Sequence, residues 1–277
     1  MNWFHSVLLG FVSGLCELLP LSAAANRGLL RQLLGIEAEG ALFMLLCRAA
    51  VLTVLLSSGL LELRRLRRTA RILRMPYRRR TGHPSLNESG TLRLLKVAVP
   101  MALVAGVLSA RLADLADKLW LVPIPLVLGG VLLWLPGVMR SANKDGRHLS
   151  GLDGLLMGLG ILAGAVPGIS PVGAVFAIAA MRGAQRRYAL RFASTMLAVS
   201  LAGSMVMDLL SIAVNGFSFD AAQLLNAGLG FLSAGLAAYL AVHAMRTMIR
   251  PGGHGIYGFC YYNWGQALLS LVLFLMV

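Results

Sequence analysis

The sequence predicts an all-α polytopic membrane protein, built as an inverted repeat with two re-entrant helical hairpins and six transmembrane helices. Three observations lead to this prediction. Of the 277 residues, 58% are hydrophobic and only 13% are charged, against about 25% charged residues in a soluble domain. Six apolar runs have roughly the 20 residues that a helix needs to cross a bilayer. Two further apolar segments, interrupted by Gly and Pro, occupy matching places in the two halves.

Residues 1–140 form the expected first repeat. Its re-entrant hairpin is predicted at 3–34, and its spans at 41–61, 92–111 and 119–138. The triplet Ala23-Ala24-Ala25 is similar to a signal-peptide cleavage site, but no basic region precedes the apolar run and Glu17 lies inside it. We therefore interpret the first segment as part of the mature structure.

Residues 151–277 form the expected second repeat. Its hairpin is predicted at 151–183, and its spans at 188–213, 222–245 and 257–277. Three spans per repeat is an odd number, so the second repeat must be inverted relative to the first. Interrupted backbone is tolerated at membrane depth where it is buried in protein or lines a wet cavity. We therefore expect the ligand where the segments Gly10–Ser22 and Gly160–Gly173 lie.

Much of the positive charge of the chain is concentrated in one segment. The net charge is +14, and nine arginines fall between Arg64 and Arg80. With the arginine-rich 62–91 loop in the cytoplasm, eighteen lysines and arginines lie inside and four outside, as the positive-inside rule requires. This places both termini outside. The same charge is suited to anionic lipid headgroups, whereas nucleic-acid binding is excluded because no soluble fold presents the patch.

Three charged residues in or beside apolar segments, Glu17, Arg27 and Arg48, are functional candidates, because intramembrane charges are costly. Glu17 is either a functional carboxylate or a protonated or ion-paired structural residue. Arg48 either pairs with an acid such as Glu17 or supplies positive charge to the ligand. Arg27 is an interfacial anchor or reaches a headgroup phosphate, and Asp208 is expected to extend toward the membrane surface from the outer end of its span.

Two motifs resemble those of a known family. The stretch Gly14-Leu-Cys-Glu17-Leu-Leu-Pro20-Leu-Ser22 resembles the signature E-G-x-T-E-F-L-P-x-S-S-T-G-H of the undecaprenyl-pyrophosphate phosphatase (bacitracin-resistance) family. The stretch Pro167–Gly173 resembles its second signature, P-G-x-S-R-S-G. The resemblance extends to the order of spans and the arginine-rich first loop, and it implies the same inverted-repeat fold.

The resemblance also implies an activity. Family members act in the bacterial plasma membrane, where they hydrolyse a polyprenyl pyrophosphate lipid to the monophosphate and so recycle the carrier for peptidoglycan synthesis. Their pocket opens toward the outer face, and they usually need a divalent cation such as Mg²⁺ or Ca²⁺. A homodimer is left open.

The family's functional residues are carried over where this chain matches the motifs. Glu17, Ser22 and Ser170 are the catalytic candidates, and Glu17 is also the candidate metal ligand. The residues expected to bind the ligand are Ser13, Asn26, Arg27, Arg48, Gly168 and Gly173. Backbone N–H groups of the Pro167–Gly173 loop are expected to cradle an anion at a helix N-terminus.

Three departures from the motifs predict impaired hydrolysis. Ser13 replaces the first glutamate, Asn26 the histidine and Pro171 the arginine. Phosphoryl transfer needs positive charge on the phosphate oxygens and a proton donor for the leaving group. Proline supplies no cation and asparagine cannot shuttle a proton, while a single carboxylate makes a weak divalent-metal site.

Three hypotheses for function remain. The chain is a divergent phosphatase that acts on the carrier, a non-catalytic polyprenyl-phosphate transporter or flippase, or a sensor that binds the carrier. Phosphate release separates the enzyme from the other two, and lipid movement across proteoliposomes separates the transporter from the sensor.

Overall fold

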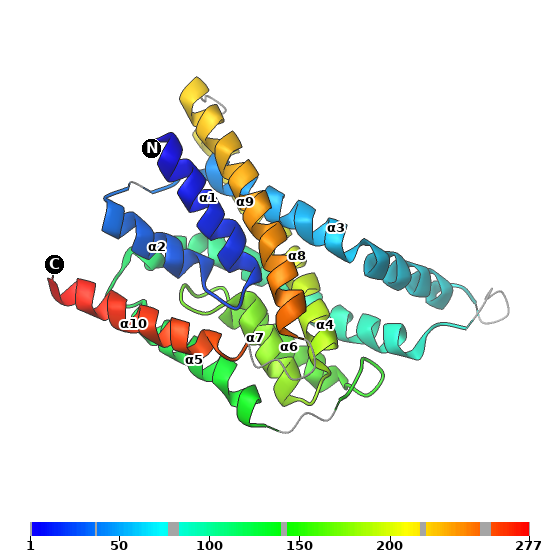
Figure 1. Cartoon of the computed structure of the whole chain (residues 1–277). Helices are drawn as coiled ribbons and strands as arrows, with labels where there is room; N and C mark the ends of the chain where they lie inside the picture. Colours follow the sequence, from blue (N-terminus) through cyan, green and yellow to red (C-terminus); the bar gives the residue numbers. More distant parts are fainter. Residues whose placement is uncertain are drawn as a thin grey trace.

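A computed structural model describes residues 2–36, 38–76, 83–139, 143–216, 220–249 and 256–276. Over these ranges the chain forms ten α-helices, one 3₁₀ helix and no strand (Figure 1). The helices are α1 (Trp3–Leu18), α2 (Ala23–Leu34), α3 (Ala41–Arg74), α4 (Leu86–Arg111), η2 (Ala113–Asp117), α5 (Pro123–Val138), α6 (Gly151–Ala163), α7 (Pro171–Met181), α8 (Arg186–Asn215), α9 (Ala221–Met248) and α10 (Phe259–Met276). The predicted all-α membrane fold is confirmed.

Each interrupted apolar segment forms two helices separated by a short non-helical break. In the first segment, residues 19–22 separate α1 from α2, and in the second, residues 164–170 separate α6 from α7. The first break contains Pro20, and the second contains Gly164, Pro167 and Gly168. Proline lacks the N–H group that helix hydrogen bonding needs, and glycine loses the most conformational entropy in a helix, so the breaks lie where these residues are placed.

Five helices are long and apolar enough to cross a membrane: α3, α4, α8, α9 and α10. The expected span at 119–138 corresponds to α5, which has only 16 residues. It begins at Pro123 because proline, which lacks an N–H group, is favoured in the first turn of a helix. Residues Ala113–Asp117, just before it, form the 3₁₀ helix η2.

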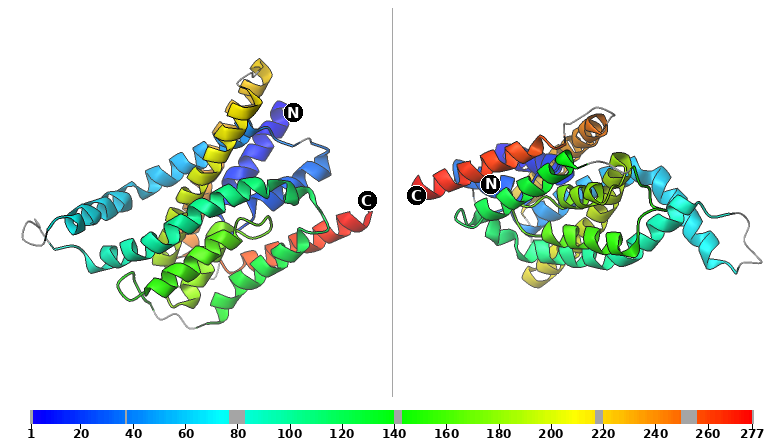
Figure 2. Two further views of the ribbon diagram at one scale, coloured as in Figure 1. Left: turned by 180° about the vertical axis from the view of Figure 1, so that it is seen from behind. Right: turned by 90° about the horizontal axis from the view of Figure 1, so that it is seen from below.

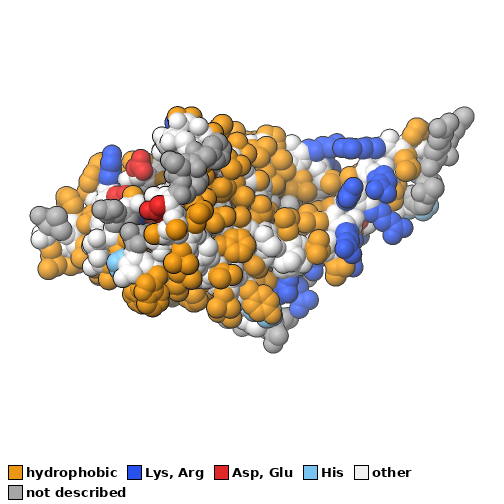
Figure 3. Space-filling view, turned by 90° about the horizontal axis from the view of Figure 1, so that it is seen from above, with side chains coloured by type: hydrophobic (Ala, Val, Ile, Leu, Met, Phe, Trp, Pro, Cys, Tyr) orange, Lys and Arg blue, Asp and Glu red, His pale blue; other side chains and the backbone are white. Residues whose placement is uncertain are grey.

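The expectation of a loop over residues 62–91 is wrong in part. Helix α3 continues to Arg74, and α4 already begins at Leu86. Arginine is a good helix former, and the first helix-breaking residue after the apolar run is Pro76. The arginines therefore extend a helix that projects from one end of the molecule, where Figure 3 shows Lys and Arg side chains gathered.

Helices of each half pack on helices of the other half, and corresponding helices have corresponding partners (Figure 2). Helix α1 packs on α9 while α6 packs on α4, and α3 packs on α9 while α8 packs on α4. Helices α5 and α10 pack side by side. Small residues allow these approaches: a Cβ at Gly14 would lie 2.0 Å from the Ala234 carbonyl oxygen, and one at Gly106 would lie 2.0 Å from that of Ser200.

Candidate functional site

The two helix breaks contact each other through a pair of serines. Ser22, the N-cap of α2, accepts hydrogen bonds at its Oγ from the Ala25 N–H (3.3 Å) and from the Gly168 N–H (2.8 Å). Ser170, the N-cap of α7, accepts from the Gly173 N–H (3.1 Å) and donates to the Leu19 carbonyl (3.4 Å). Each serine therefore caps its own helix and also bonds to the other break.

Two candidate glycines lie at close approaches, Gly168 in the second break and Gly173 in the first turn of α7. Gly168 has a φ of 111°, in the region that favours glycine, and a Cβ there would lie 2.8 Å from Pro125 Cγ. A Cβ added to Gly173 would lie 3.2 Å from that of Pro20. The two glycines therefore allow the second break to lie against α5 and against the first break.

Three backbone N–H groups of the Pro167–Gly173 loop, the expected anion cradle, already have acceptors within the protein. The N–H of Gly168 donates to Ser22, that of Ile169 to the Val166 carbonyl (3.1 Å), and that of Gly173 to Ser170. These three donors stabilise the break and are not presented to a ligand. The cradle stays a prediction for the other N–H groups of the loop.

A cavity of about 50 Å³ lies beside the joined breaks, and we call it the central cavity. At about 10–15 Å³ per water molecule, this is room for a few waters or one small anionic group. Both breaks contribute to its wall, together with α1, α2, α3, α4, α7 and α8. Its charged and hydroxyl-bearing lining residues are Glu17, Ser22, Arg27, Arg48, Ser109, Ser200 and Ser204.

Ser13 and Glu39 hold the Arg27 side chain at the wall of the central cavity. Its side chain is buried, and its Nη1 donates to Ser13 Oγ at 3.0 Å. Its Nε lies 3.7 Å from Glu39 Oε1, and Glu39 also pairs with Arg31, which in turn pairs with Asp117. The interfacial-anchor interpretation of Arg27 is therefore wrong. The residue is an internal cation fixed by a chain of ion pairs.

Arg48 pairs with Asp208, not with Glu17. The pair joins α3 in the first half to α8 in the second, and both residues are buried, Asp208 with only 8% of its surface exposed. The expectation that Asp208 extends to the membrane surface is therefore wrong. A buried charge is tolerated when it is paired, and Arg48 supplies that partner while it also lines the central cavity.

Glu17 lines the central cavity without a protein partner. Within the described part of the chain its carboxylate forms no hydrogen bond and no ion pair, although Arg27 and Arg48 line the same cavity. The cavity therefore combines two guanidinium groups with one available carboxyl group. Phosphate groups are the ligands that such guanidinium groups bind well.

The donor set around Glu17 does not fit a tightly held Mg²⁺ or Ca²⁺ ion. Divalent cations of this kind take several oxygen ligands, carboxylates foremost. Among the described residues, no three His, Cys, Asp or Glu side chains converge on one point. Glu17 instead shares its cavity with Arg27 and Arg48, whose guanidinium groups are donors only and cannot coordinate a cation.

Five predicted site residues lie outside the cavity lining: the two glycines Gly168 and Gly173, and the three polar residues Ser13, Asn26 and Ser170. Ser13 accepts the hydrogen bond from Arg27 and so supports it. Asn26 donates to the Ser22 carbonyl (2.8 Å) and to Gln266 Oε1 (3.4 Å), and its Oδ1 accepts from Tyr262, so its side chain faces α10. Ser170 lies within the second break, occupied by its capping contacts.

Sequence reasoning missed the hydroxyl groups that line the opposite wall. Ser200 and Ser204 are four residues apart in α8 and so share one helix face. The Oγ atoms of Ser204 and Ser109 are 3.0 Å apart, and Ser204 also donates to the Gly106 carbonyl at 2.9 Å. The four-residue spacing of two serines in an apolar helix is the signal that would have found them.

Comparisons with known proteins agree along nearly the whole chain. A family model described as bacitracin resistance protein BacA matches residues 6–269. The undecaprenyl-diphosphatase of Carboxydothermus hydrogenoformans is 28% identical, with 99% of this chain and 98% of the relative covered. That of Paracoccus denitrificans is 29% identical, with 97% and 96% covered, and that of Methanobrevibacter smithii is 25% identical, with 99% and 98% covered.

Proposed function

This chain belongs to the bacitracin resistance protein BacA family, and from that premise we propose that its central cavity binds the phosphate end of a polyprenyl phosphate or pyrophosphate carrier. The relatives are named undecaprenyl-diphosphatase, which supplies the ligand class. The single observation that supports the proposal most is the convergence of Arg27, Arg48 and Glu17 on one cavity where the two helix breaks meet.

The two guanidinium groups bind the phosphate oxygens in this proposal. Arg27 and Arg48 each use part of the guanidinium group for Ser13 and Asp208, respectively, and both line the cavity. Arginine binds phosphate through paired N–H donors that act in a fixed plane. Ser200 adds a hydroxyl donor from α8, whereas the Ser204 hydroxyl already donates to the Gly106 carbonyl. When protonated, Glu17 also donates a hydrogen bond to the phosphate.

Hydrolysis of the pyrophosphate to phosphate and the lipid monophosphate is impaired in this proposal. Pro171 lines the cavity without a cation, and the hydroxyl groups of Ser22 and Ser170 already bond to the backbone. Asn26 faces α10. Among the described residues that line the cavity, Glu17 is then the only carboxyl group, so activation of water and protonation of the leaving group depend on one carboxyl.

Phosphate release from undecaprenyl pyrophosphate tests this part of the proposal. The purified protein is compared with Glu17→Gln, each with Mg²⁺, with Ca²⁺ and with a chelator. We expect slow release that no metal restores, together with measurable binding of the lipid. Rapid release that disappears in Glu17→Gln would contradict impaired hydrolysis, and the absence of both release and binding would contradict the proposal as a whole.

Movement of the lipid across the bilayer is a second candidate function. The exchange of packing partners, α1 on α9 against α6 on α4, is the pattern that an inverted repeat of residues 1–140 and 151–277 produces. Inverted repeats with broken helices are suited to alternating access. Transfer of labelled polyprenyl phosphate across proteoliposomes supports a transporter, whereas binding without transfer supports a sensor.

We also propose the orientation of the chain in a bacterial plasma membrane. The arginine-rich end of α3 lies in the cytoplasm and both termini lie outside, since Figure 1 shows the termini at the end of the molecule away from the projecting end of α3. The three native cysteines are buried, so introduced ones report alone. A membrane-impermeant maleimide applied to intact cells is expected to label Leu275→Cys and not Arg71→Cys.

A homodimer is a separate proposal, and native mass spectrometry of the purified protein tests it.

A further inference from the structure

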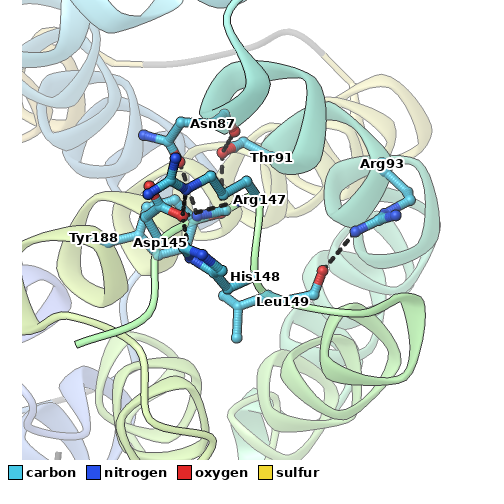
Figure 4. Close-up of polar contacts among 9 residues, drawn as sticks. Asn87, Thr91, Arg93, Asp145, Arg147, His148, Leu149 and Tyr188 are labelled. Carbon is cyan, nitrogen blue, oxygen red and sulfur yellow. Dashed lines mark hydrogen bonds and ion pairs between the residues drawn. The ribbon is translucent and has the colours of Figure 1, made fainter. Parts of the chain in front are cut away.

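A second pocket lies away from the central cavity, at the start of α4. Its volume is about 470 Å³, and its lining residues are Leu86, Ser89, Gly90, Arg93, Arg147 and His148. None of these residues lines the central cavity. Figure 4 shows Arg93 on α4, with Arg147 and His148 in the segment that leads into α6. We call this the α4 pocket.

The segment that carries Arg147 and His148 is fixed firmly against α4. A Cβ on Gly90 would lie 2.0 Å from the Gly146 carbonyl oxygen, so the two backbones are in direct contact. The Gly146 N–H donates to Asn87 Oδ1 at 2.8 Å. Arg93 Nη2 donates to the Leu149 carbonyl at 2.6 Å. The pocket is therefore built from a rigid contact between helix and loop.

The charge of the α4 pocket is positive. One carboxylate, Asp145, lies 3.4 Å from Arg147 Nε and 2.8 Å from His148 Nδ1. Arg93 forms no ion pair within the described ranges, and Lys96 is exposed one turn further along α4. Within the described residues Asp145 is the one acid that pairs with the lining groups, so basic groups are in excess around a volume large enough for a phosphate group.

We propose that the α4 pocket binds a phosphate group, and that the group belongs to the headgroup of an anionic membrane lipid. Arg93 and Arg147 contact the phosphate oxygens, and Ser89 adds a hydroxyl donor. Basic pockets between membrane helices bind anionic headgroups in this way. Val97 and Val104 follow Arg93 on the same face of α4 and are 36% and 56% exposed, so a hydrocarbon chain has apolar surface to lie on.

Calorimetric titration of the detergent-solubilised full-length protein tests the pocket. The probes are short-chain dihexanoyl phosphatidylglycerol and, in a separate arm, inorganic phosphate. In the double variant Arg93→Gln/Arg147→Gln, we expect the dissociation constant for the lipid to rise at least about tenfold. The matched control Arg67→Gln/Arg71→Gln removes the same charge from exposed positions of α3, and we expect a change within about twofold.

Each outcome decides the proposal. A larger loss of lipid affinity in the pocket variant than in the control supports it, and binding of inorganic phosphate with the same dependence on Arg93 and Arg147 assigns a free phosphate as the source. Equal losses in the two variants, or no loss in either, overturn it. Because Arg93 also bonds to the Leu149 carbonyl, the single variant Arg147→Gln is measured too, and it should lower lipid affinity while leaving the thermal midpoint unchanged.

Discussion

The two helix breaks have the same architecture but differ in the chemistry they carry. Each ends in a serine that caps the next helix and bonds to the other break, Ser22 in the first and Ser170 in the second. The first break is flanked by Glu17 and Arg27, both of which line the central cavity. The second adds only backbone and apolar groups, such as Pro167 and Pro171.

At the central cavity, one half of the chain therefore supplies shape and the other supplies the charged groups. The second break contributes shape, through glycine at a φ of 111° and serine caps, whereas the first half contributes the charge. Among the described residues of the second half, Asp208 is the only acid that pairs with a cavity-lining cation, which is Arg48. The geometry of the joined breaks therefore does not require charged groups in both halves of the chain.

The largest expected effect comes from removing the ion pair that joins the charged first half to α8. Arg48→Leu leaves Asp208 buried without a partner, and we expect a loss of about 3–5 kcal/mol in the free energy of unfolding. Unfolding in mixed detergent micelles measures it. The double variant Arg48→Leu/Asp208→Leu should recover most of the loss, and a double variant as unstable as the single one would show that the pair is not what stabilises this contact.

A second variant tests whether the second break depends on its backbone. Gly168→Ala forces a side chain into a strained φ and against Pro125, and we expect a loss of about 2–3 kcal/mol. Gly216→Ala is the matched control, because Gly216 has a φ of 92° but no neighbouring atom within 4 Å. The control should lose about 1 kcal/mol. Equal losses would mean that the close packing of Gly168 contributes nothing.

The two serine caps provide a finer comparison. Ser22→Ala leaves two backbone N–H groups without an acceptor, those of Ala25 and Gly168, whereas Ser170→Ala leaves one, that of Gly173. We expect losses in unfolding free energy of about 2 and about 1 kcal/mol, respectively. The same micelle assay ranks them, and the reverse order would contradict the assigned contacts.

The smallest effect on ligand binding is expected for Asn26→Ala. Its side chain bonds to Gln266 and Tyr262 on α10 and does not line the central cavity. The affinity for a polyprenyl phosphate should stay within about twofold, while stability falls by about 1 kcal/mol. A titration that shows a tenfold loss of affinity would show instead that Asn26 contributes to ligand binding.

Apolar run length and Gly/Pro interruptions were enough to predict the helices and both breaks. The end of α3 was missed because the arginines end the apolar run by which a membrane span is recognised. Arginine is nevertheless a good helix former, so the helix continues to Arg74. The start of α5 was missed because apolar composition alone does not show where Pro123 begins the helix. Local sequence pattern therefore predicts which helices form more accurately than it predicts where each helix begins and ends.

The charged partners in the site could not be predicted in the same way. Arg48 and Asp208 are 160 residues apart, and only the packing of α3 on α8 brings them together. Glu39 lies just before α3 in a short polar connection, yet its side chain is only 3% exposed because Arg27 and Arg31 fold over it. Such pairs depend on tertiary contact, and a single sequence carries no local signal for it.

The most direct test of the central cavity is the affinity of the purified protein for undecaprenyl pyrophosphate when Arg27 is changed. Arg27→Gln should weaken binding at least about tenfold, because a charge-assisted contact to phosphate is lost. Arg71→Gln, which removes an exposed charge from α3, should change binding by less than about twofold. If Arg27→Gln folds normally and binds the lipid as tightly as the unaltered protein, the central cavity is not the phosphate site.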